Sequence, residues 1–349
     1  MRSSASLLSV FRALFLVLFV FGVLFAQDLN QQKQDFIKQV REIDKQLADN
    51  PTTQEYEDLI KQRQKLEANI KKINAEMMAD VETAKKINAV KKAYNDANNA
   101  YKLGNYQEAL ANYDKAISLD ATFYKAHYGK GLTLKKLRKY DEAIAAYQGS
   151  LEQNPAYTEA SVALGKIYGQ IGQPDNAIKV HKAAIENRPG AYKAYYELGA
   201  VYLNKKKDYN KAALNFQKAT QLDSTYDLAF LSLGVALTEL NRSNEAVIAF
   251  DNALNVTKRK KWHAPYYRKA VVYYKLGSYS KAKAAADQAL QNKRNYAPAA
   301  YEAGRASKEL GQYQTAINYF KIAAKDRQWK RTADYEIDLI VNRDKYGGN

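Results

Sequence analysis

The sequence predicts an all-α protein in which one unit of about 34 residues is repeated seven times. The first observation is a recurring small residue: Ala97, Gly131, Gly165, Gly199, Gly234, Ala270 and Gly304. The second is an alanine twelve or thirteen residues after each of them: Ala109, Ala143, Ala177, Ala212, Ala246, Ala282 and Ala316. Because the two series keep nearly the same step over seven copies, we predict a tandem array rather than a single globular core.

Composition limits the classes of function. The chain has 349 residues and a formal net charge of +17, which favours acidic partners. It has no cysteine, which excludes disulfides, thiolate metal sites and cysteine nucleophiles. The sequence contains no nucleophile elbow, phosphate-binding loop or dinucleotide fingerprint, and two of its three histidines, His127 and His181, replace packing aromatics. The sequence therefore predicts a non-enzymatic protein without catalytic residues, metal or cofactor.

Residues 1–26 have the order of a secretory signal peptide. Arg2 and Arg12 precede an unbroken apolar run over residues 13–25, and Ala26 is the expected last residue removed. The run is shorter than the roughly 20 residues that a membrane span needs. Leu24 is large for the third position before the cut, which leaves an uncleaved anchor as the alternative. Export, with a periplasm as the expected compartment, makes nucleic acid an unsuitable partner despite the positive charge.

Residues 27–89 are expected to form a coiled-coil or helical stalk. Apolar residues recur at seven-residue spacing on both sides of a break at residues 50–53: Leu29, Phe36 and Ile43, then Leu59, Leu66 and Ile73. The short break favours an antiparallel hairpin, and Thr52 or Thr53 can cap its second helix. That helix is the longer one, so part of its apolar stripe lacks a partner within the chain. Two interpretations remain open: self-association through this stripe, or packing of the hairpin on the first repeat.

The repeat unit resembles the tetratricopeptide repeat (TPR) in its period and in its small-residue, alanine and aromatic pattern. The resemblance implies two antiparallel helices per repeat, A and B, in a right-handed solenoid over residues 90–325. The repeats then start near residues 90, 124, 158, 192, 227, 263 and 297. A ring four residues after the alanine is expected to fill the space against the next repeat: Tyr113, Tyr147, His181, Phe216, Phe250 and Phe320. Residues 326–349 are expected to form a capping helix and a tail.

Three places depart from the repeat. The run Lys205–Asp208 lengthens the hairpin turn of repeat four by one residue, and the run Lys258–His263 adds two residues between repeats five and six. Repeat six has Ala286 where a ring is expected. The basic residues 258–261 suit contact with an anionic polymer or membrane surface, and equally suit an ordinary solvated loop.

The A helices of TPR proteins line a concave groove that accepts an extended or helical peptide. The resemblance places groove positions three residues before the small residue and one and four residues after it, and basic residues also occur six residues before it. The candidate partner-binding residues at these positions are Lys91, Tyr94, Asn98, Tyr101, Lys125, Tyr128, Lys135, Lys166, Lys193, Tyr196, Tyr267, Tyr274, Tyr301 and Arg305. Tyrosines interleaved with cations suit a ligand with apolar and acidic groups. The alternative is that these tyrosines, like many of the 28 in the chain, mainly pack between helices.

The order of export signal, heptad helices and TPR array resembles that of bacterial periplasmic proteins such as the Tol-Pal-associated cell division coordinator. The resemblance implies a scaffold or adaptor in envelope assembly or division that binds a protein or peptide of acidic character. A clamp for a C-terminal carboxylate is not supported, because Tyr94 and Gly129 occupy positions of its lysine and second asparagine. Two alternatives remain: a module that binds an anionic envelope polymer such as peptidoglycan, and a regulatory subunit of an envelope enzyme.

Overall fold

The structure is a computed structural model that describes residues 27–47 and 52–343. All regular secondary structure in these residues is helical, as predicted. The predicted signal peptide and the last six residues lie outside the described part of the chain. No helix within that part is long and apolar enough to cross a lipid bilayer.

Contacts divide the chain into two compact units. The first ends at Asp96 and includes Ser118–Asp120, and the second contains Ala97–Ile117 and the chain from Ala121 onward. Helix α2 (Thr53–Leu103) crosses this division without a break. The stalk and the first A helix are therefore one continuous helix, and the predicted boundary at residue 89 lies inside it.

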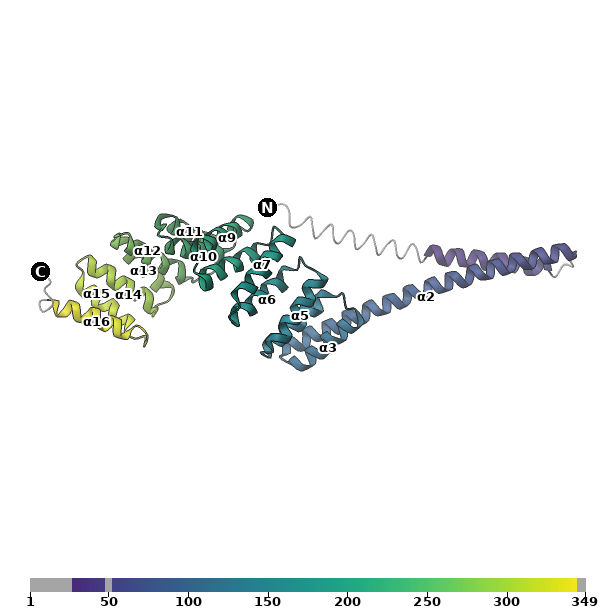
Figure 1. Ribbon diagram of the computed structural model, residues 1–349, viewed down its shortest axis with the longest axis horizontal. Helices are drawn as coiled ribbons and strands as arrows, with labels where there is room; N and C mark the ends of the chain where they lie inside the picture. Colours follow the sequence, from purple (N-terminus) through teal and green to yellow (C-terminus); the bar gives the residue numbers. More distant parts are fainter. Residues whose placement is uncertain (1–26, 48–51, 344–349) are drawn as a thin grey trace. The chain divides into compact units, whose positions relative to one another are not determined.

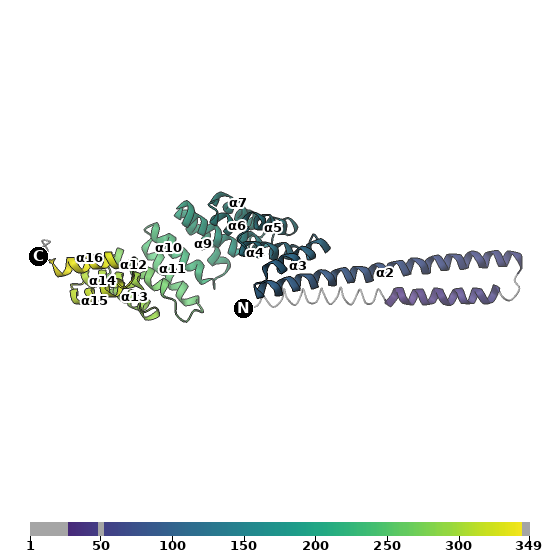
Figure 2. The same cartoon turned by 90° about the horizontal axis from the view of Figure 1, so that it is seen from below.

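The first unit contains an antiparallel helical pair. The helix over residues 27–47 lies beside the first part of α2 (Figures 1 and 2). Leu29, Ile43 and Ile73 are buried, and Asp44 accepts a hydrogen bond from Arg63 at 2.8 Å. These contacts support the predicted hairpin.

The start and the exposed stripe of α2 both follow from its sequence. Thr52 donates from its backbone N–H and its hydroxyl to the Glu55 carboxylate, at 2.9 and 2.7 Å, which caps the helix. Farther along, Ile87 lies two heptads after Ile73 in the row that contains Leu59 and Leu66, and it is exposed in the described structure, as are Met78 and Val81 beside that row. This is the part of the stripe for which the sequence predicts no partner within the hairpin, and self-association through it stays a prediction.

The second unit is a series of antiparallel helix pairs followed by a cap. The A helices after α2 are α4 (Tyr124–Lys136), α6 (Thr158–Gln170), α8 (Tyr192–Val201), α10 (Asp227–Glu239), α12 (His263–Lys275) and α14 (Ala297–Glu309). The B helices are α3 (Tyr106–Leu119), α5 (Tyr140–Gln153), α7 (Pro174–Asn187), α9 (Tyr209–Leu222), α11 (Ser243–Val256), α13 (Tyr279–Asn292) and α15 (Tyr313–Ala323). The six A helices begin at intervals of 34, 34, 35, 36 and 34 residues.

Close approach of the A and B helices explains the recurring small residue. A Cβ atom on Gly131 would lie 2.6 Å from the Tyr147 ring, and one on Gly234 would lie 2.4 Å from the Phe250 ring. Both rings are fully buried. Tyr147 also packs in one cluster with Leu164 of the next repeat, so each ring fills the space within its repeat and between repeats.

Repeats one and six show two ways of replacing this pair. Repeat six combines Ala270 with Ala286, and both are fully buried, so a larger A-helix residue faces a smaller B-helix residue. In repeat one, Tyr113 lies against Gly129 of the next repeat, where a Cβ atom would be 2.4 Å from the ring. The missing ring of repeat six is therefore compensated within the same helix pair.

The extra residue of repeat four lies in a helix, which corrects the predicted longer turn. The end of α8 widens into a π-helix, η1 (Tyr202–Lys206), and Lys207 then adopts a left-handed conformation with φ of 55°. Asp208 donates its N–H to the Tyr202 carbonyl at 3.0 Å. A π-helix absorbs one residue within a helical turn, and Lys207 then holds the left-handed position directly before the N-cap of the B helix, as Arg138 does in repeat two.

The turn between A and B helices requires a left-handed residue. Gly104, Gly172, Gly277 and Gly311 have φ between 67° and 83°, whereas Arg138 holds the same region with φ of 60°. A left-handed conformation costs an L-residue roughly 1–2 kcal/mol, which glycine avoids at a smaller loss of chain entropy. We expect Arg138→Gly to raise the free energy of unfolding by about 0.5–1 kcal/mol in urea titrations. Arg138→Ala retains the Cβ atom, so an equal gain in that variant would contradict the explanation.

The C-terminal cap agrees with the sequence prediction. Helix α16 (Lys330–Val341) buries Ala333 and Ile340 against Phe320 of repeat seven. It thereby covers the apolar surface that a further repeat would cover.

Candidate functional site

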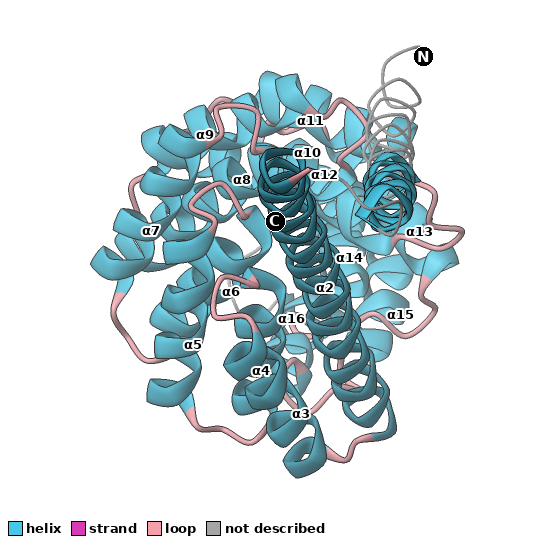
Figure 3. Cartoon of the chain, turned by 90° about the vertical axis from the view of Figure 1, so that its right-hand side faces the viewer, coloured by secondary structure: helices cyan, strands magenta, loops and turns pink. Residues whose placement is uncertain are grey.

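The predicted binding positions share one side of the A helices, which we call the inner face. At 100° per residue, the positions six and three before the small residue and one and four after it fall within one quarter of the helix circumference. Figure 3 shows the A helices α4 to α14 toward the inside of the second unit and the B helices around them. The inner face is therefore the surface along which these positions recur.

All fourteen candidate residues lie on A helices. Helix α2 carries Lys91, Tyr94, Asn98 and Tyr101, of which the first two belong to the first unit; α4 carries Lys125, Tyr128 and Lys135; α6 carries Lys166; α8 carries Lys193 and Tyr196; α12 carries Tyr267 and Tyr274; α14 carries Tyr301 and Arg305. Their neighbours distinguish four groups: tyrosines that pack on a ring of the next repeat or the cap, cations without carboxylate partners, residues with other contacts inside the array, and charged residues in a network.

Four of the tyrosines contact a ring that begins the next repeat or the cap. The ring centroids of Tyr128 and Tyr157 are 5.2 Å apart, and Tyr196–Tyr226, Tyr267–Tyr296 and Tyr301–Trp329 lie at 5.0, 5.5 and 5.0 Å. Burial raises the pKa of Tyr196 and Tyr267. Burial also raises the pKa of Tyr301 to about 12, with a further contribution from Glu336. These half-buried, neutral tyrosines join successive repeats and present only part of each ring to the inner face.

The ring partners Tyr157, Tyr226, Tyr296 and Trp329 were not among the candidates. Each is the residue immediately before a helix, α6, α10, α14 or α16. The sequence carries a signal for them, because each follows an inner-face tyrosine by slightly less than one repeat. Repeats two, four and six add a third ring to this pair, namely Tyr124, Tyr192 and His263 at 4.8, 5.3 and 4.4 Å from the shared partner.

Exposed cations border these three-ring clusters. Lys125 Nζ lies 5.9 Å from the Tyr124 ring centroid, Lys193 Nζ lies 5.8 Å from that of Tyr192, and the Arg268 guanidinium lies 5.4 Å from that of Tyr267. All three cations are exposed. No carboxylate in the described ranges forms an ion pair with Lys125 or Lys193. A cation beside an aromatic face keeps its charge available to a ligand at a loss of only about 0.5–1 kcal/mol of cation–π attraction.

Other inner-face candidates make contacts within the array. Lys166 forms a 2.8 Å ion pair with Glu197, which links α6 to α8. Asn98 accepts a hydrogen bond from the Tyr113 hydroxyl at 2.7 Å. Tyr101 packs on Tyr106 at 5.7 Å.

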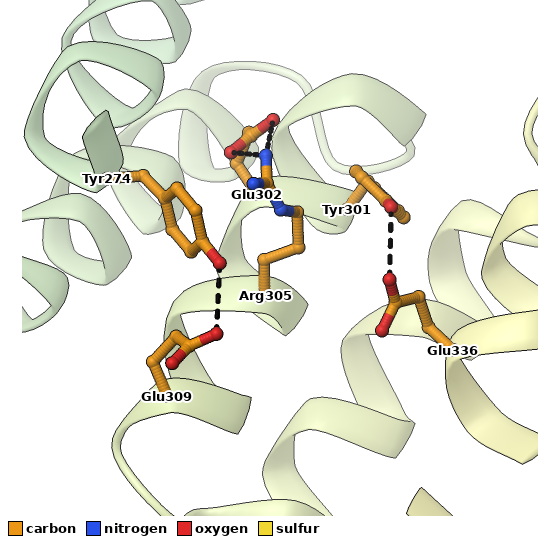
Figure 4. A network of polar contacts seen from close by, with 6 residues as sticks. All are labelled: Tyr274, Tyr301, Glu302, Arg305, Glu309 and Glu336. Atoms are coloured by element: carbon orange, nitrogen blue, oxygen red, sulfur yellow. Dashed lines mark hydrogen bonds and ion pairs between the residues drawn. The ribbon is translucent and has the colours of Figure 1, made fainter. Parts of the chain in front are cut away.

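The inner face of repeats six and seven carries a connected polar network (Figure 4). The Arg305 guanidinium lies 3.7 Å from the Tyr274 ring centroid and donates to both oxygens of Glu302 at 3.3 Å. The Tyr274 hydroxyl donates to Glu309 at 3.0 Å. Burial raises the pKa of Glu302, and the nearby Arg305 partly offsets this effect.

The same network reaches the cap. Lys308 pairs with Glu336 of α16 at 2.8 Å, and the Tyr301 hydroxyl donates to the same carboxylate at 3.4 Å. Basic groups at this end are therefore neutralised by nearby carboxylates. Of the candidate cations on the A helices after α2, those without an ion pair among the described residues are Lys125 and Lys135 on α4 and Lys193 on α8.

The basic loop before repeat six is partly held by the fold. Arg259 pairs with Asp227 at 2.9 Å and lies over the Trp262 ring, and Thr257 donates to the same carboxylate at 2.7 Å. Burial opposes ionisation of Asp227, but the hydrogen bonds from Arg259 and Thr257 outweigh it and lower its pKa. Lys260 and Lys261 are exposed, and their role stays a prediction.

The histidines have different surroundings. His181 is 1% exposed and burial lowers its pKa to about 4, so it is neutral at physiological pH. His127 lies 2.9 Å from the Ala121 carbonyl, and His263 packs on Tyr296. In the part of the chain that the structure describes, no three histidine or carboxylate side chains gather as metal ligands would.

Comparison with known proteins identifies the repeats. Residues 94–158, residues 134–200, and residues 192–226 with 263–296 match family models of the tetratricopeptide repeat. No curated protein sequence matches the chain.

Solved structures of three proteins share the fold. A tetratricopeptide repeat protein from Parabacteroides merdae has 16% identity and a TM-score of 0.50, over 73% of this chain and 100% of that one. PilF of Pseudomonas aeruginosa has 20% identity and a TM-score of 0.51, over 63% and 97%. The hetero-tetramer Cut9–Hcn1 of the APC/C has 18% identity and a TM-score of 0.51, over 68% and 49%. Residues 94–226 and 263–296 therefore match the tetratricopeptide repeat, and the described helix pairs have the fold of a tetratricopeptide repeat solenoid.

Proposed function

We propose that this protein is an exported, non-enzymatic adaptor that binds an acidic protein or peptide along its inner face in the cell envelope. The TPR fold is a protein-interaction module, which is the basis for a protein or peptide partner. The observation that carries the acidic character of the partner is the pair of unpaired, exposed lysines, Lys125 and Lys193, each beside a cluster of half-buried rings. The order of apolar N-terminal segment, helical hairpin and repeat array supports the envelope location.

Charge and rings have separate roles in this proposal. Exposed lysines accelerate encounter with an acidic partner and align it, while the ring edges supply rigid contact area. Because Lys125 and Lys193 occupy the same position in repeats two and four, a chain that crosses α4, α6 and α8 meets both. A partner with acidic residues spaced along an extended segment fits this arrangement.

The test reverses the two charges without removing a packing residue. We expect Lys125→Glu/Lys193→Glu to lower the affinity for the partner captured from an envelope extract by at least about tenfold, and to weaken the dependence of affinity on salt. Binding can be measured by biolayer interferometry with the captured partner immobilised. The matched control is Lys179→Glu/Lys182→Glu, which makes the same charge change at exposed positions of the B helix α7.

Three outcomes separate the proposal from its rivals. Equal losses in both variants would show a general charge effect and contradict an inner-face site. Retention on purified cell wall alone, lost at high salt, would favour an anionic polymer as the ligand. Recovery of one stoichiometric protein whose binding survives glycan digestion supports the adaptor.

A further inference from the structure

A cavity of about 270 Å³ opens on the inner face between repeats three and four. The residues that line its interior are small or buried: Gly165, Gly169, His181, Ala200 and Val201. More exposed polar side chains surround its mouth: Lys166, Gln170, Glu197, Asn204 and Lys205. The cavity therefore has an apolar interior and a polar rim.

Three departures from the repeat pattern lie at this cavity. Gly169 occupies a position where the other six repeats carry a side chain: Tyr101, Lys135, Leu203, Thr238, Tyr274 and Lys308. A Cβ atom on Gly169 would meet no atom within 4 Å, so the missing side chain leaves open space. The inserted residue of repeat four produces η1, and η1 supplies Asn204 and Lys205 to the rim. π-helical turns of this kind occur frequently at functional sites.

The third departure is a polar atom in the interior. His181 stands where repeats four, five and seven have phenylalanine, and it is 1% exposed. Its Nδ1 atom has no hydrogen-bond partner among the residues described. A phenyl ring would fill the same space without an unsatisfied nitrogen, so packing alone gives no reason for histidine at this position.

The hollows on the opposite side of the array do not combine several departures from the repeat in this way. One of about 490 Å³ lies between α5 and α7, and one of about 520 Å³ lies between α9 and α11. Five of the ten residues that line the first hollow have equivalents in the second, two repeats later, as Gln148 with Gln217 and Leu164 with Leu233 show. These larger hollows recur with the repeat and follow from its regular geometry, whereas the cavity beside His181 arises from departures.

The charge at the rim selects the ligand. Lys166 is paired with Glu197 at 2.8 Å, and no carboxylate within the described residues pairs with Lys205. The rim therefore carries one uncompensated positive charge, together with amide donors on Gln170 and Asn204. An acidic side chain places its methylene groups against the apolar interior and its carboxylate among these donors.

We infer that the cavity binds the carboxylate side chain of an acidic residue in a peptide that lies along the inner face. This inference rests on the proposed function and names the group that repeats three and four recognise. Lys205 supplies the charge, Asn204 and Gln170 supply amide hydrogen bonds, and the His181 ring forms the interior wall. The absence of a side chain at Gly169 makes the space.

The test fills the cavity with a side chain that the repeat already tolerates. Random dodecapeptides displayed on phage are selected against the full chain, and the enriched peptides are synthesised for affinity measurements. We expect an aspartate or glutamate at one fixed position of the enriched peptides. We expect Gly169→Leu to weaken their binding by about tenfold or more, because leucine already occupies the equivalent position 203 of repeat four. Thr238→Leu makes the matched change in repeat five and should leave affinity within about twofold.

The outcomes distinguish binding in the cavity from binding elsewhere along the inner face. Replacing the fixed acidic residue of the peptide by its amide should lower the affinity for the wild-type protein. The same replacement should change the affinity for Gly169→Leu little, because both changes remove the same contact. Enriched peptides without a fixed acidic residue, or wild-type affinity in Gly169→Leu, would contradict the inference that the cavity binds a carboxylate side chain. If these peptides nevertheless bind Lys125→Glu/Lys193→Glu more weakly than the wild type, the proposed function is supported and only the role of the cavity is contradicted. A selection that enriches no peptide overturns both.

Discussion

Gly234→Ala is expected to destabilise repeat five by about 1–2 kcal/mol, although alanine is the better helix former. Glycine in a helix costs about 1 kcal/mol relative to alanine, so propensity alone favours the substitution. The new Cβ atom, however, would lie 2.4, 2.6 and 2.8 Å from three atoms of the fully buried Phe250 ring. Overpacking of this kind typically costs 1–3 kcal/mol and rises when the ring cannot move. We expect the clash to exceed the gain in helix propensity.

Gly169→Ala is the matched control for this prediction. Both glycines lie inside A helices, but a Cβ atom at position 169 meets nothing within 4 Å. The control should therefore be neutral or stabilising by up to about 1 kcal/mol. Amide hydrogen exchange of the affected helices reports each repeat separately, which matters because long repeat arrays need not unfold in one step. A stabilised Gly234→Ala would show that A–B contact does not select the small residue.

A second substitution shows whether the clash is with Phe250. Phe250→Ala alone should cost about 3–5 kcal/mol, because it leaves a cavity in a fully buried position. The double variant recreates the Ala270 and Ala286 pair of repeat six, where both residues are fully buried. It should be more stable than the sum of the single changes predicts, with a coupling energy on the order of 2 kcal/mol. Additive losses would place the cost of Gly234→Ala elsewhere than at the Phe250 ring.

The contact between a small A-helix residue and a buried B-helix ring also explains why so much of the fold can be predicted from the sequence. A glycine such as Gly131 recurs because its helix must touch a ring such as Tyr147, so spacing alone reports helix contact. The starts of α4 to α14 and the position of the cap follow from that spacing. The π-helix at residues 202–206 does not follow, because one extra residue fits equally into a turn or a helical turn.

Less of the candidate site than of the fold can be predicted from the sequence. Position in the repeat places Tyr128 and Tyr196 on the inner face, but it does not show that Tyr157 and Tyr226 already cover part of their rings. Likewise, Lys166 and Lys193 look alike in the sequence, whereas only Lys166 has a carboxylate partner. Contacts between side chains of successive repeats depend on the offset between those repeats. That offset is a property of the packed array and not of one repeat.

The second large effect concerns His181, whose substitution by phenylalanine should stabilise the array and remove part of its pH dependence. Burial lowers the pKa of His181 to about 4 from the ordinary value of 6.5. The unfolded chain therefore binds a proton at a higher pH than the folded one. The contribution of the neutral histidine is fully present above pH 6.5 and is lost as the pH falls from 6.5 to 4. The difference of the two pKa values corresponds to about 3 kcal/mol.

His181→Phe removes this proton linkage and the unsatisfied Nδ1 atom at once. At pH 7 we expect a gain of about 1–2 kcal/mol, because repeats four, five and seven already pack a phenyl ring at this position. Between pH 6.5 and 4 the advantage over the wild type should widen by about 3 kcal/mol, as measured by urea unfolding at each pH. Carboxylates titrate in both proteins, so the difference between the two curves isolates the histidine.

The size of this difference also bears on why a histidine is present. His263 is partly exposed against Tyr296, and His263→Gln should change the slope of stability with pH far less than His181→Phe does. If the two variants gave equal slopes, His181 would have to be hydrated in solution, and its ring would not be the dry wall of the cavity between repeats three and four. If instead the predicted widening is observed, the array tolerates an internal group that weakens it at low pH. A fold built only for packing has no reason to keep that group, so its place beside Gly169 and Lys205 is best explained by a ligand.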